Sequence, residues 1–164
     1  MRLLLAAAIL SLSAITACSG GSTAGSAAPA TPAVTADSAQ TILDRHVAAM
    51  KAGDLAAVMT DYADNAVVIA PHGIAPGEVN VGGFNVFDGK ANISRLFAVL
   101  AGKDNAAAMA SMTTTYDFKG SDVVLMPWVQ FKGQPNEVSG TDVWVIRDGK
   151  VQSQTVLVNP APAK

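Results

Sequence analysis

The sequence predicts an α+β domain in which about three N-terminal helices pack on a curved antiparallel β-sheet. Apolar residues recur at helical spacing in the first part of the chain, whereas from about Ala108 they alternate with a period of two. Near the end, Asp148-Gly149 is a strong signal for a tight β-hairpin. With 164 residues, the chain is long enough for one domain with its own core.

The first predicted helix carries an apolar stripe. Ile42, His46 and Met50 lie at positions i, i+4 and i+8, and Leu43 and Val47 lie beside them. This spacing places His46 in the middle of the buried face. Such a histidine is either a core residue with one hydrogen-bond partner or a polar group in a ligand pocket.

Capping residues delimit this helix and the next one. Asp37 or Ser38 can cap the start of the first helix, and Gly53 fits its end. Asp54 can then cap a second, short helix. The apolar stripe of this second helix consists of Leu55, Val58, Met59 and Tyr62.

A short run rich in valine and isoleucine, residues 66–70, predicts a strand that ends at Pro71. Residues 74–87 contain glycines and a proline and predict a loop that holds a short strand. Asp88 can cap a third helix, which ends at Gly102. The apolar face of this helix consists of Ile93, Leu96, Phe97 and Leu100.

The rest of the chain predicts antiparallel strands joined by turns. The predicted strands span residues 108–118, 123–131, 138–147 and 150–158. Pro127 cannot donate to a strand ladder, so it marks a bulge or an edge. Asp148-Gly149 predicts a type I′ turn, in which both central residues need a positive φ.

A two-residue turn at Asp148-Gly149 pairs Arg147 with Lys150 and Asp142 with Thr155. One face of the hairpin then carries Asp142, Trp144, Ile146, Val151, Ser153, Thr155 and Leu157. The other face carries Val143 and Val145. Because both faces are partly apolar, we expect one to cover the helices and the other to meet a second subunit in a homodimer.

Residues 1–17 have the features of a leader peptide. Met1-Arg2 gives a positive start, and the apolar residues 3–12 are too few to span a membrane as a helix. The segment Ile15-Thr16-Ala17-Cys18 resembles the lipobox of bacterial lipoproteins, in which cleavage precedes a cysteine that then carries lipid. An ordinary signal peptide followed by an unmodified cysteine is the alternative.

Cys18 is the only cysteine, so an intramolecular disulfide is impossible. Ser19 in place of aspartate favours the outer membrane over the inner one, by resemblance to enterobacterial lipoprotein sorting. Residues 18–36 are uncharged and rich in Gly, Ser, Ala, Thr and Pro, and we expect a flexible tether that reaches on the order of 25 Å. The folded domain is expected at residues 37–158, followed by a loose tail at 159–164.

The charge balance bears on possible partners. The formal net charge is -2, and removal of Arg2 with the leader leaves ten basic and thirteen acidic side chains, about -3. Nucleic-acid binding needs a basic patch, so we expect none. Two histidines far apart and a single cysteine predict no metal site, and we expect no cofactor.

Three segments resemble the NTF2-like (nuclear transport factor 2) superfamily, which includes ketosteroid isomerases and SnoaL-like polyketide cyclases. They are Tyr62 to Val68 with Pro71-His72-Gly73, Phe87 to Lys90 with Ile93 and Phe97, and Thr141 to Val151. The resemblance covers roughly residues 37–158. It implies a cone-shaped α+β fold with a cavity between the helices and the concave sheet.

The resemblance also implies site residues. In ketosteroid isomerases the position before Pro71 is the aspartate base, and here it is Ala70. The oxyanion-hole tyrosine of that family falls on His46, and the oxyanion-hole aspartate falls on Asp142. Because the base is missing, we do not expect steroid isomerisation by the family mechanism.

His46 and Asp142 are the candidate catalytic residues. If they meet, they form either an acid/base pair or a structural pair, and Thr155 is another possible partner for Asp142. The candidate pocket residues are Tyr62, Ala70, His72, Phe87, Phe97 and Trp144. His72 fits the rim of the pocket better than the role of a base.

These residues lead to three hypotheses. The first is a lipid-anchored envelope protein that binds a small, largely apolar molecule. The second is an acid/base enzyme, an isomerase, cyclase or hydratase, that uses His46 and Asp142. The third is a non-catalytic dimeric module whose cavity is filled by side chains; fold alone does not choose among them.

Overall fold

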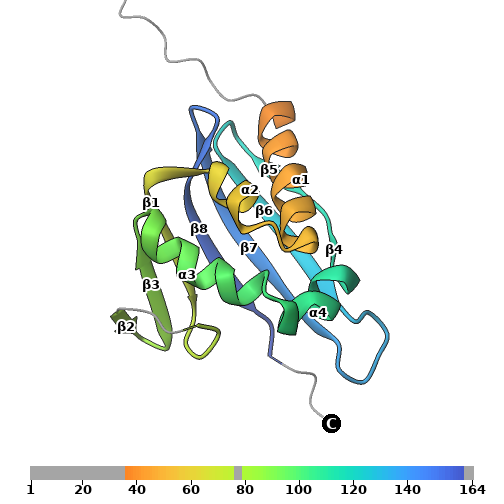
Figure 1. The fold of residues 1–164 in the computed structure, drawn as a ribbon. Coiled ribbons are helices and arrows are strands. Elements are labelled where there is room, and N and C mark those ends of the chain that lie inside the picture. The colour runs from red at the N-terminus through yellow and green to blue at the C-terminus, as the bar shows by residue number, and fades with distance from the viewer. Residues whose placement is uncertain (1–35, 76–78, 161–164) are drawn as a thin grey trace, which may run out of the picture. The chain divides into compact units, whose positions relative to one another are not determined.

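The computed structural model describes residues 36–75 and 79–160 (Figure 1). The helices are α1 (Ala36–Ala52), α2 (Leu55–Thr60), α3 (Lys90–Leu100) and α4 (Ala106–Ser111), with a 3₁₀ turn, η1 (Lys103–Asn105), between the last two. The predicted leader, nearly all of the tether and most of the tail lie outside the described residues. None of the described helices is both long and apolar enough to cross a membrane.

The strands form one curved, open sheet. They are β1 (Tyr62–Pro71), β2 (Val79–Val81), β3 (Phe84–Asp88), β4 (Thr113–Thr114), β5 (Asp117–Lys119), β6 (Val123–Gln130), β7 (Val138–Arg147) and β8 (Lys150–Val158). Their order is β2-β3-β1-β8-β7-β6-β4, and β5 also pairs with β6. All pairs are antiparallel except β1 with β8, which is parallel. The helices cover one face of this sheet (Figure 1), so the predicted fold class is confirmed.

The stripe predicted on α1 is buried. Ile42, His46 and Met50 are 5%, 3% and 6% exposed. The predicted cap at Asp37 or Ser38 is wrong, because α1 begins at Ala36 and both residues lie within it. Alanine is the strongest helix former, which allows the helix to begin earlier than its polar residues suggest.

The break between α1 and α2 follows the prediction. Gly53 has a φ of +70°, and Asp54 accepts a hydrogen bond of 3.0 Å from the Ala57 N–H. The predicted cap of α3 is wrong, because Asp88 is the exposed last residue of β3. Gly89, with a φ of +75°, stands at the cap position without a side-chain hydrogen bond.

The first strand predicted after α3 is partly wrong. Residues 106–111 form α4, and the strand region begins only at Thr113. Short alanine-rich segments favour helix, but six residues are too few to show a helical period. Pro127 sits beside the gap between β4 and β5, where its carbonyl accepts from the Thr115 N–H, so it lies at the interrupted edge that the sequence predicted.

The last hairpin has the predicted turn but not the predicted register. Asp148 and Gly149 have φ values of +53° and +69°, and Arg147 pairs with Lys150. A bulge then shifts the register, so that Asp142 faces Val156 and not Thr155. The shift turns Gln154 toward the core, where it is 3% exposed, and turns Thr155 outward.

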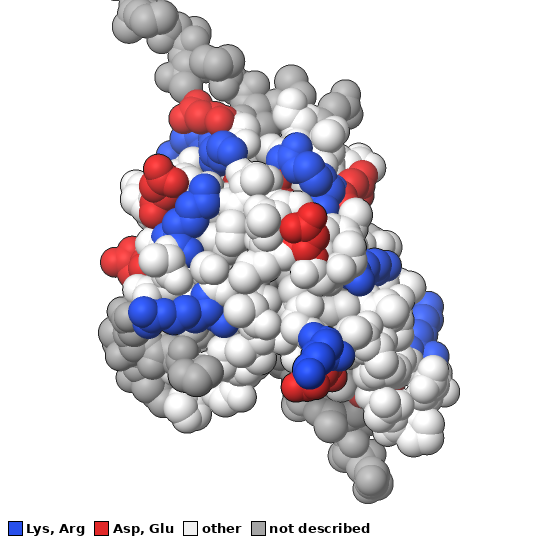
Figure 2. Space-filling model, in the orientation of Figure 1, with Lys and Arg blue, Asp and Glu red and all other residues white. Residues whose placement is uncertain are grey.

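The surface carries charges of both signs. On the face shown in Figure 2, Lys and Arg are interspersed with Asp and Glu and no basic patch stands out. The outer face of the sheet includes the half-buried Val143 and Val145. The core lies between the helices and the inner sheet face, and its largest fully buried side chains are Trp144, Tyr62, Phe87, Phe97 and Leu43.

Candidate functional site: a cavity between the helices and the sheet

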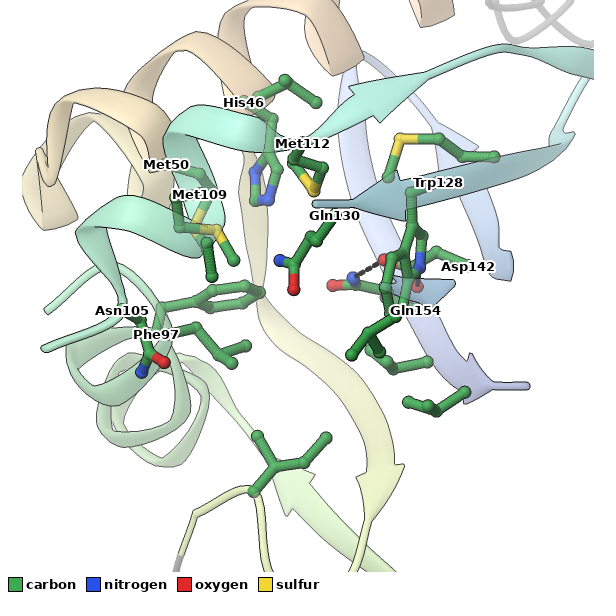
Figure 3. Close-up of a pocket in the computed structure, with 18 of the residues that line it drawn as sticks. His46, Met50, Phe97, Asn105, Met109, Met112, Trp128, Gln130, Asp142 and Gln154 are labelled. Atoms are coloured by element: carbon green, nitrogen blue, oxygen red, sulfur yellow. Dashed lines mark hydrogen bonds between the residues drawn. The ribbon is translucent and has the colours of Figure 1, made fainter. Parts of the chain in front are cut away.

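A cavity of about 400 Å³ lies between the helices and the inner face of the sheet (Figure 3). Most of its lining side chains are apolar, including Met50, Met109, Met112, Met126, Phe97, Trp128 and Trp144. Its polar lining groups are His46, Asn105, Gln130, Asp142 and Gln154. Figure 3 shows His46 entering from α1 and the Gln130 amide projecting into the space.

Asp142 lies at the end of a buried hydrogen-bond chain. Its Oδ1 accepts a 2.8 Å bond from Trp128 Nε1, and its Oδ2 accepts a 2.7 Å bond from Gln154 Nε2. Gln154 Oε1 in turn accepts a 2.5 Å bond from the Tyr62 hydroxyl. All donors in this chain are neutral, so burial outweighs the two hydrogen bonds and raises the pKa of Asp142 to about 6.

Tyr62 closes the other end of this chain. It is 1% exposed, and burial raises its pKa well above 10, with the nearby Asp142 and Asp61 carboxylates adding to the shift. Tyr62 therefore stays protonated and acts as a fixed donor to Gln154. This donor holds the Gln154 amide with its nitrogen toward Asp142.

Gly140 on β7 allows Trp128 to reach Asp142. A Cβ at Gly140 would lie 2.3 Å from Trp128 Cζ2 and 2.2 Å from the Leu157 carbonyl oxygen. Neither distance is sterically possible, and the second atom belongs to the backbone. The absence of a side chain at Gly140 is therefore what lets the indole approach the β7 backbone so closely.

His46 has a second, buried carboxylate beside it. Its Nδ1 lies 3.5 Å from Asp61 Oδ2, while Asp61 Oδ1 accepts from Arg45, with Nε at 2.8 Å. Asp61 is fully buried at the junction of α2 and β1. With a proton on Nδ1 facing this carboxylate, Nε2 is left as a lone-pair acceptor.

Three aromatic rings surround the His46 imidazole. The ring centroids of Trp144, Phe97 and Tyr62 lie 5.0, 5.4 and 5.7 Å from it, all in edge-to-face orientation. The Trp144 indole N–H is buried and has no partner among the described residues. Rings on three sides fix the plane of the imidazole.

The structure brings four of the predicted site residues to one cavity, namely His46, Asp142, Phe97 and Trp144. Each candidate catalytic residue has its own partners, Asp61 for His46 and the Trp128–Gln154 pair for Asp142.

The other predicted pocket residues lie elsewhere. Tyr62 lies behind the wall and reaches the cavity through Gln154. Ala70 and Phe87 are buried in the core away from the lining, and the exposed His72 lies 3.2 Å from Asn85 Oδ1.

Sequence reasoning missed Asp61, Trp128 and Gln154 as site residues. For Asp61 no signal was present in the sequence, because Tyr62 beside it was assigned to the second helix, whereas the structure begins β1 at Tyr62. Trp128 lies on a predicted strand with no signal that marks it as a site residue, and Gln154 faces inward only because of the bulge in β8. The described residues hold no group of three or more His, Cys, Asp or Glu side chains that could bind a metal ion.

Helices packed over one face of a curved, open sheet, with an apolar cavity between the layers, define the class of NTF2-like proteins. Residues 43–154 match the family model of the SnoaL-like domain, and this chain belongs to that family. Among curated proteins, no sequence matches the chain.

Solved structures share the fold at low sequence identity. An NTF2-like protein from Burkholderia xenovorans is 19% identical, with a TM-score of 0.57 over 78% of this chain and 88% of its own. A proposed isomerase from Bacillus subtilis is 21% identical, with a TM-score of 0.56 over 76% and 88%. TerC, co-crystallised with polyporic acid, is 16% identical, with a TM-score of 0.53 over 74% and 92%.

Proposed function

We propose that this domain binds a small, largely apolar molecule in the cavity between the helices and the sheet. The observation that carries the proposal is the cavity itself, with about 400 Å³ of space and a mainly apolar lining. Ligand pockets typically enclose ~300–1,000 Å³ and combine apolar walls with a few fixed polar groups. His46, Asp142 and Gln154 supply such groups here.

The methionines of the lining support this proposal. Met50, Met109, Met112 and Met126 border the space. Unbranched thioether side chains adapt to a ligand's shape and make favourable contacts with aromatic rings. TerC, a neighbour in fold, was crystallised with a small organic molecule, polyporic acid.

A titration with the neutral, apolar dye Nile red tests the proposal. We expect saturable binding with a blue-shifted emission for the wild-type protein. Ala108→Trp fills the cavity from α4 and should abolish it, whereas Ala48→Trp on the exposed face of α1 should not. Equal binding by all three proteins would place the dye outside the cavity and contradict the proposal.

A second candidate function is acid/base catalysis on the bound molecule. The observation that favours it is the His46–Asp61 pair, which leaves Nε2 as a base on the cavity wall. Once a ligand is identified, its incubation with the protein in D₂O should introduce deuterium at an acidic C–H bond. His46→Ala and Asp142→Asn should remove this exchange, and exchange that both variants retain would exclude these residues.

A third candidate is a dimeric interaction module. The cavity of about 400 Å³ counts against the version in which side chains fill that space. A homodimer through the outer sheet face remains part of the proposal, because Val143 and Val145 point outward. Sedimentation should show a dimer that Val145→Lys dissociates and Val99→Lys on α3 does not.

We also propose that the protein is a cell-envelope lipoprotein anchored through Cys18. The lipobox-like segment and the uncharged stretch after it support this proposal. Cys18→Ala should release the protein from membrane fractions, and unchanged membrane association would contradict the anchor. Ser19→Asp should move the protein from the outer to the inner membrane.

A further inference from the structure

We propose that the molecule bound in the cavity carries an ammonium group, which sits against the Asp142 carboxylate. This inference rests on the proposed binding function and adds the ligand's charge to it. The apolar remainder of the ligand would occupy the aromatic and methionine-lined space. The ligand class is therefore a lipophilic amine.

Asp142 has no lysine or arginine beside it in the described lining of the cavity. Asp142 is 6% exposed and lines the cavity. Its two hydrogen-bond donors, Trp128 and Gln154, are neutral, and the described lining contains no lysine or arginine. A buried carboxylate without a cation is costly, and a protein retains such a group where a partner compensates it. A cationic ligand would be that partner.

The polar groups of the cavity wall can offer hydrogen-bond acceptors to a ligand. Each Asp142 oxygen receives one protein hydrogen bond and has capacity for another. Asp61 faces Nδ1 of His46, which leaves Nε2 to accept. The Gln130 amide projects into the same space and can present its oxygen (Figure 3). An ammonium group has three N–H donors and no acceptor, and it matches this set.

Aromatic rings in the lining also favour a cation. Trp128, Trp144 and Phe97 border the cavity, and Trp128 touches Asp142 directly through its N–H. Aromatic rings attract a cation electrostatically, most strongly for tryptophan, and the attraction grows when water is excluded. A carboxylate beside tryptophan rings therefore favours an organic cation over a neutral group of the same shape.

The pH dependence follows from the groups that face Asp142. Burial raises the pKa of Asp142 to about 6 in the empty cavity. Below that pH the carboxyl group is mostly protonated, so it must release its proton before an ammonium group can pair with it, and binding weakens. Tyr62 on β1 stays neutral, because its pKa lies well above 10. His46 on α1, backed by Asp61, is the other titratable group of the lining.

Three indole compounds of matched shape test the inference by calorimetry on the full-length protein. They are tryptamine, a cation, tryptophol, its neutral analogue, and indole-3-acetate, an anion. We expect tryptamine to bind at least tenfold more tightly than tryptophol at pH 8, and indole-3-acetate to bind most weakly. Asp142→Asn should remove the preference for tryptamine, whereas Asp104→Asn, an exposed carboxylate outside the lining, should keep it.

A pH series on the wild-type protein tests the inference without a variant, so the result does not depend on whether a variant folds. Tryptamine affinity should fall up to tenfold per pH unit below about 6, while tryptophol affinity should stay nearly constant. A tryptamine affinity that stays constant from pH 8 to pH 4 would contradict the pairing of the ammonium with Asp142.

The outcomes separate this inference from the proposed function. Tryptophol or indole-3-acetate binding as tightly as tryptamine would overturn the charge inference and leave the binding function in place. A preference for tryptamine that survives Asp142→Asn would also overturn it. No binding of any of the three up to about 10 mM would count against both, because even weak pocket binding is measurable at that concentration.

Discussion

Trp128 donates its indole N–H to Asp142 Oδ1 across 2.8 Å, and this bond joins β6 to β7 at the wall of the cavity. The two residues belong to neighbouring strands and are almost fully buried. Their contact holds the carboxylate at the wall and leaves it without a charged partner. This one hydrogen bond therefore contributes both to the stability of the domain and to the chemistry of its cavity.

Gly140→Ala should break this arrangement. The new methyl group would lie 2.3 Å from Trp128 and 2.2 Å from the Leu157 carbonyl, so the indole and the β7–β8 ladder must both move. Overpacking of this kind costs about 1–3 kcal/mol. Urea unfolding should report that loss, together with a change in tryptophan fluorescence. An unchanged free energy of unfolding would mean that the strands relax without cost.

Asp142→Asn should change how stability depends on pH. The folded pKa of about 6 exceeds the ordinary value of 3.8, so the folded state binds the proton more tightly than the unfolded state. The stabilising contribution of Asp142 to the free energy of unfolding is therefore fully present below pH 3.8 and is lost as the pH rises through about 6. The loss amounts to about 3 kcal/mol.

The measurement for this prediction is the free energy of unfolding at pH 4 and at pH 8. The Asn variant should gain stability relative to the wild type as the pH rises between them. Any change in hydrogen bonding affects both pH values alike and cancels in the comparison. Parallel stability curves for the two proteins would show that Asp142 does not titrate in this window.

Asp61→Asn should release His46. The carboxylate contacts the imidazole Nδ1 and Arg45, and it is fully buried. Its loss should cost about 1–3 kcal/mol of stability, because a buried hydrogen-bonded charge is replaced by an amide that fits its donors less well. Nitrogen NMR should show Nδ1–H in the wild type and a mixture of tautomers in the variant. A single fixed tautomer in both the wild type and the variant would contradict a role of Asp61 in orienting His46.

Tyr62→Phe should cost more than Tyr116→Phe. The Tyr62 hydroxyl donates to Gln154 inside the core, and its removal leaves the Gln154 oxygen without this donor. That loss should cost about 1–3 kcal/mol. The Tyr116 hydroxyl donates to Asp44 at an exposed site, where water can replace it. Thermal unfolding of the two variants should show the difference, and equal losses would contradict the buried chain.

The elements with strong local signals were predictable from sequence. The stripe on α1 is repeated over three turns, so the burial of His46 followed from spacing alone. The turn at Asp148-Gly149 needs positive φ at both residues, which few other dipeptides favour. These signals depend on neighbouring residues and not on distant contacts.

The arrangement of the cavity wall was not predictable in the same way. A bulge of one residue in β8 reverses which side chains face inward, so Gln154 replaced Thr155 beside Asp142. Asp61 reaches His46 only after α1 and β1 pack together. Both effects arise from tertiary packing, which produces no periodic pattern of residues in the sequence.

Native mass spectrometry of the protein from its own host, beside its Ala108→Trp variant, tests the central claim most directly. We expect the wild-type protein to retain a small molecule that is released on denaturation, and the variant to carry none. Fragmentation of the released molecule would also show whether it contains an amine. Spectra that show only the mass of the chain for both proteins would contradict a binding function for the cavity.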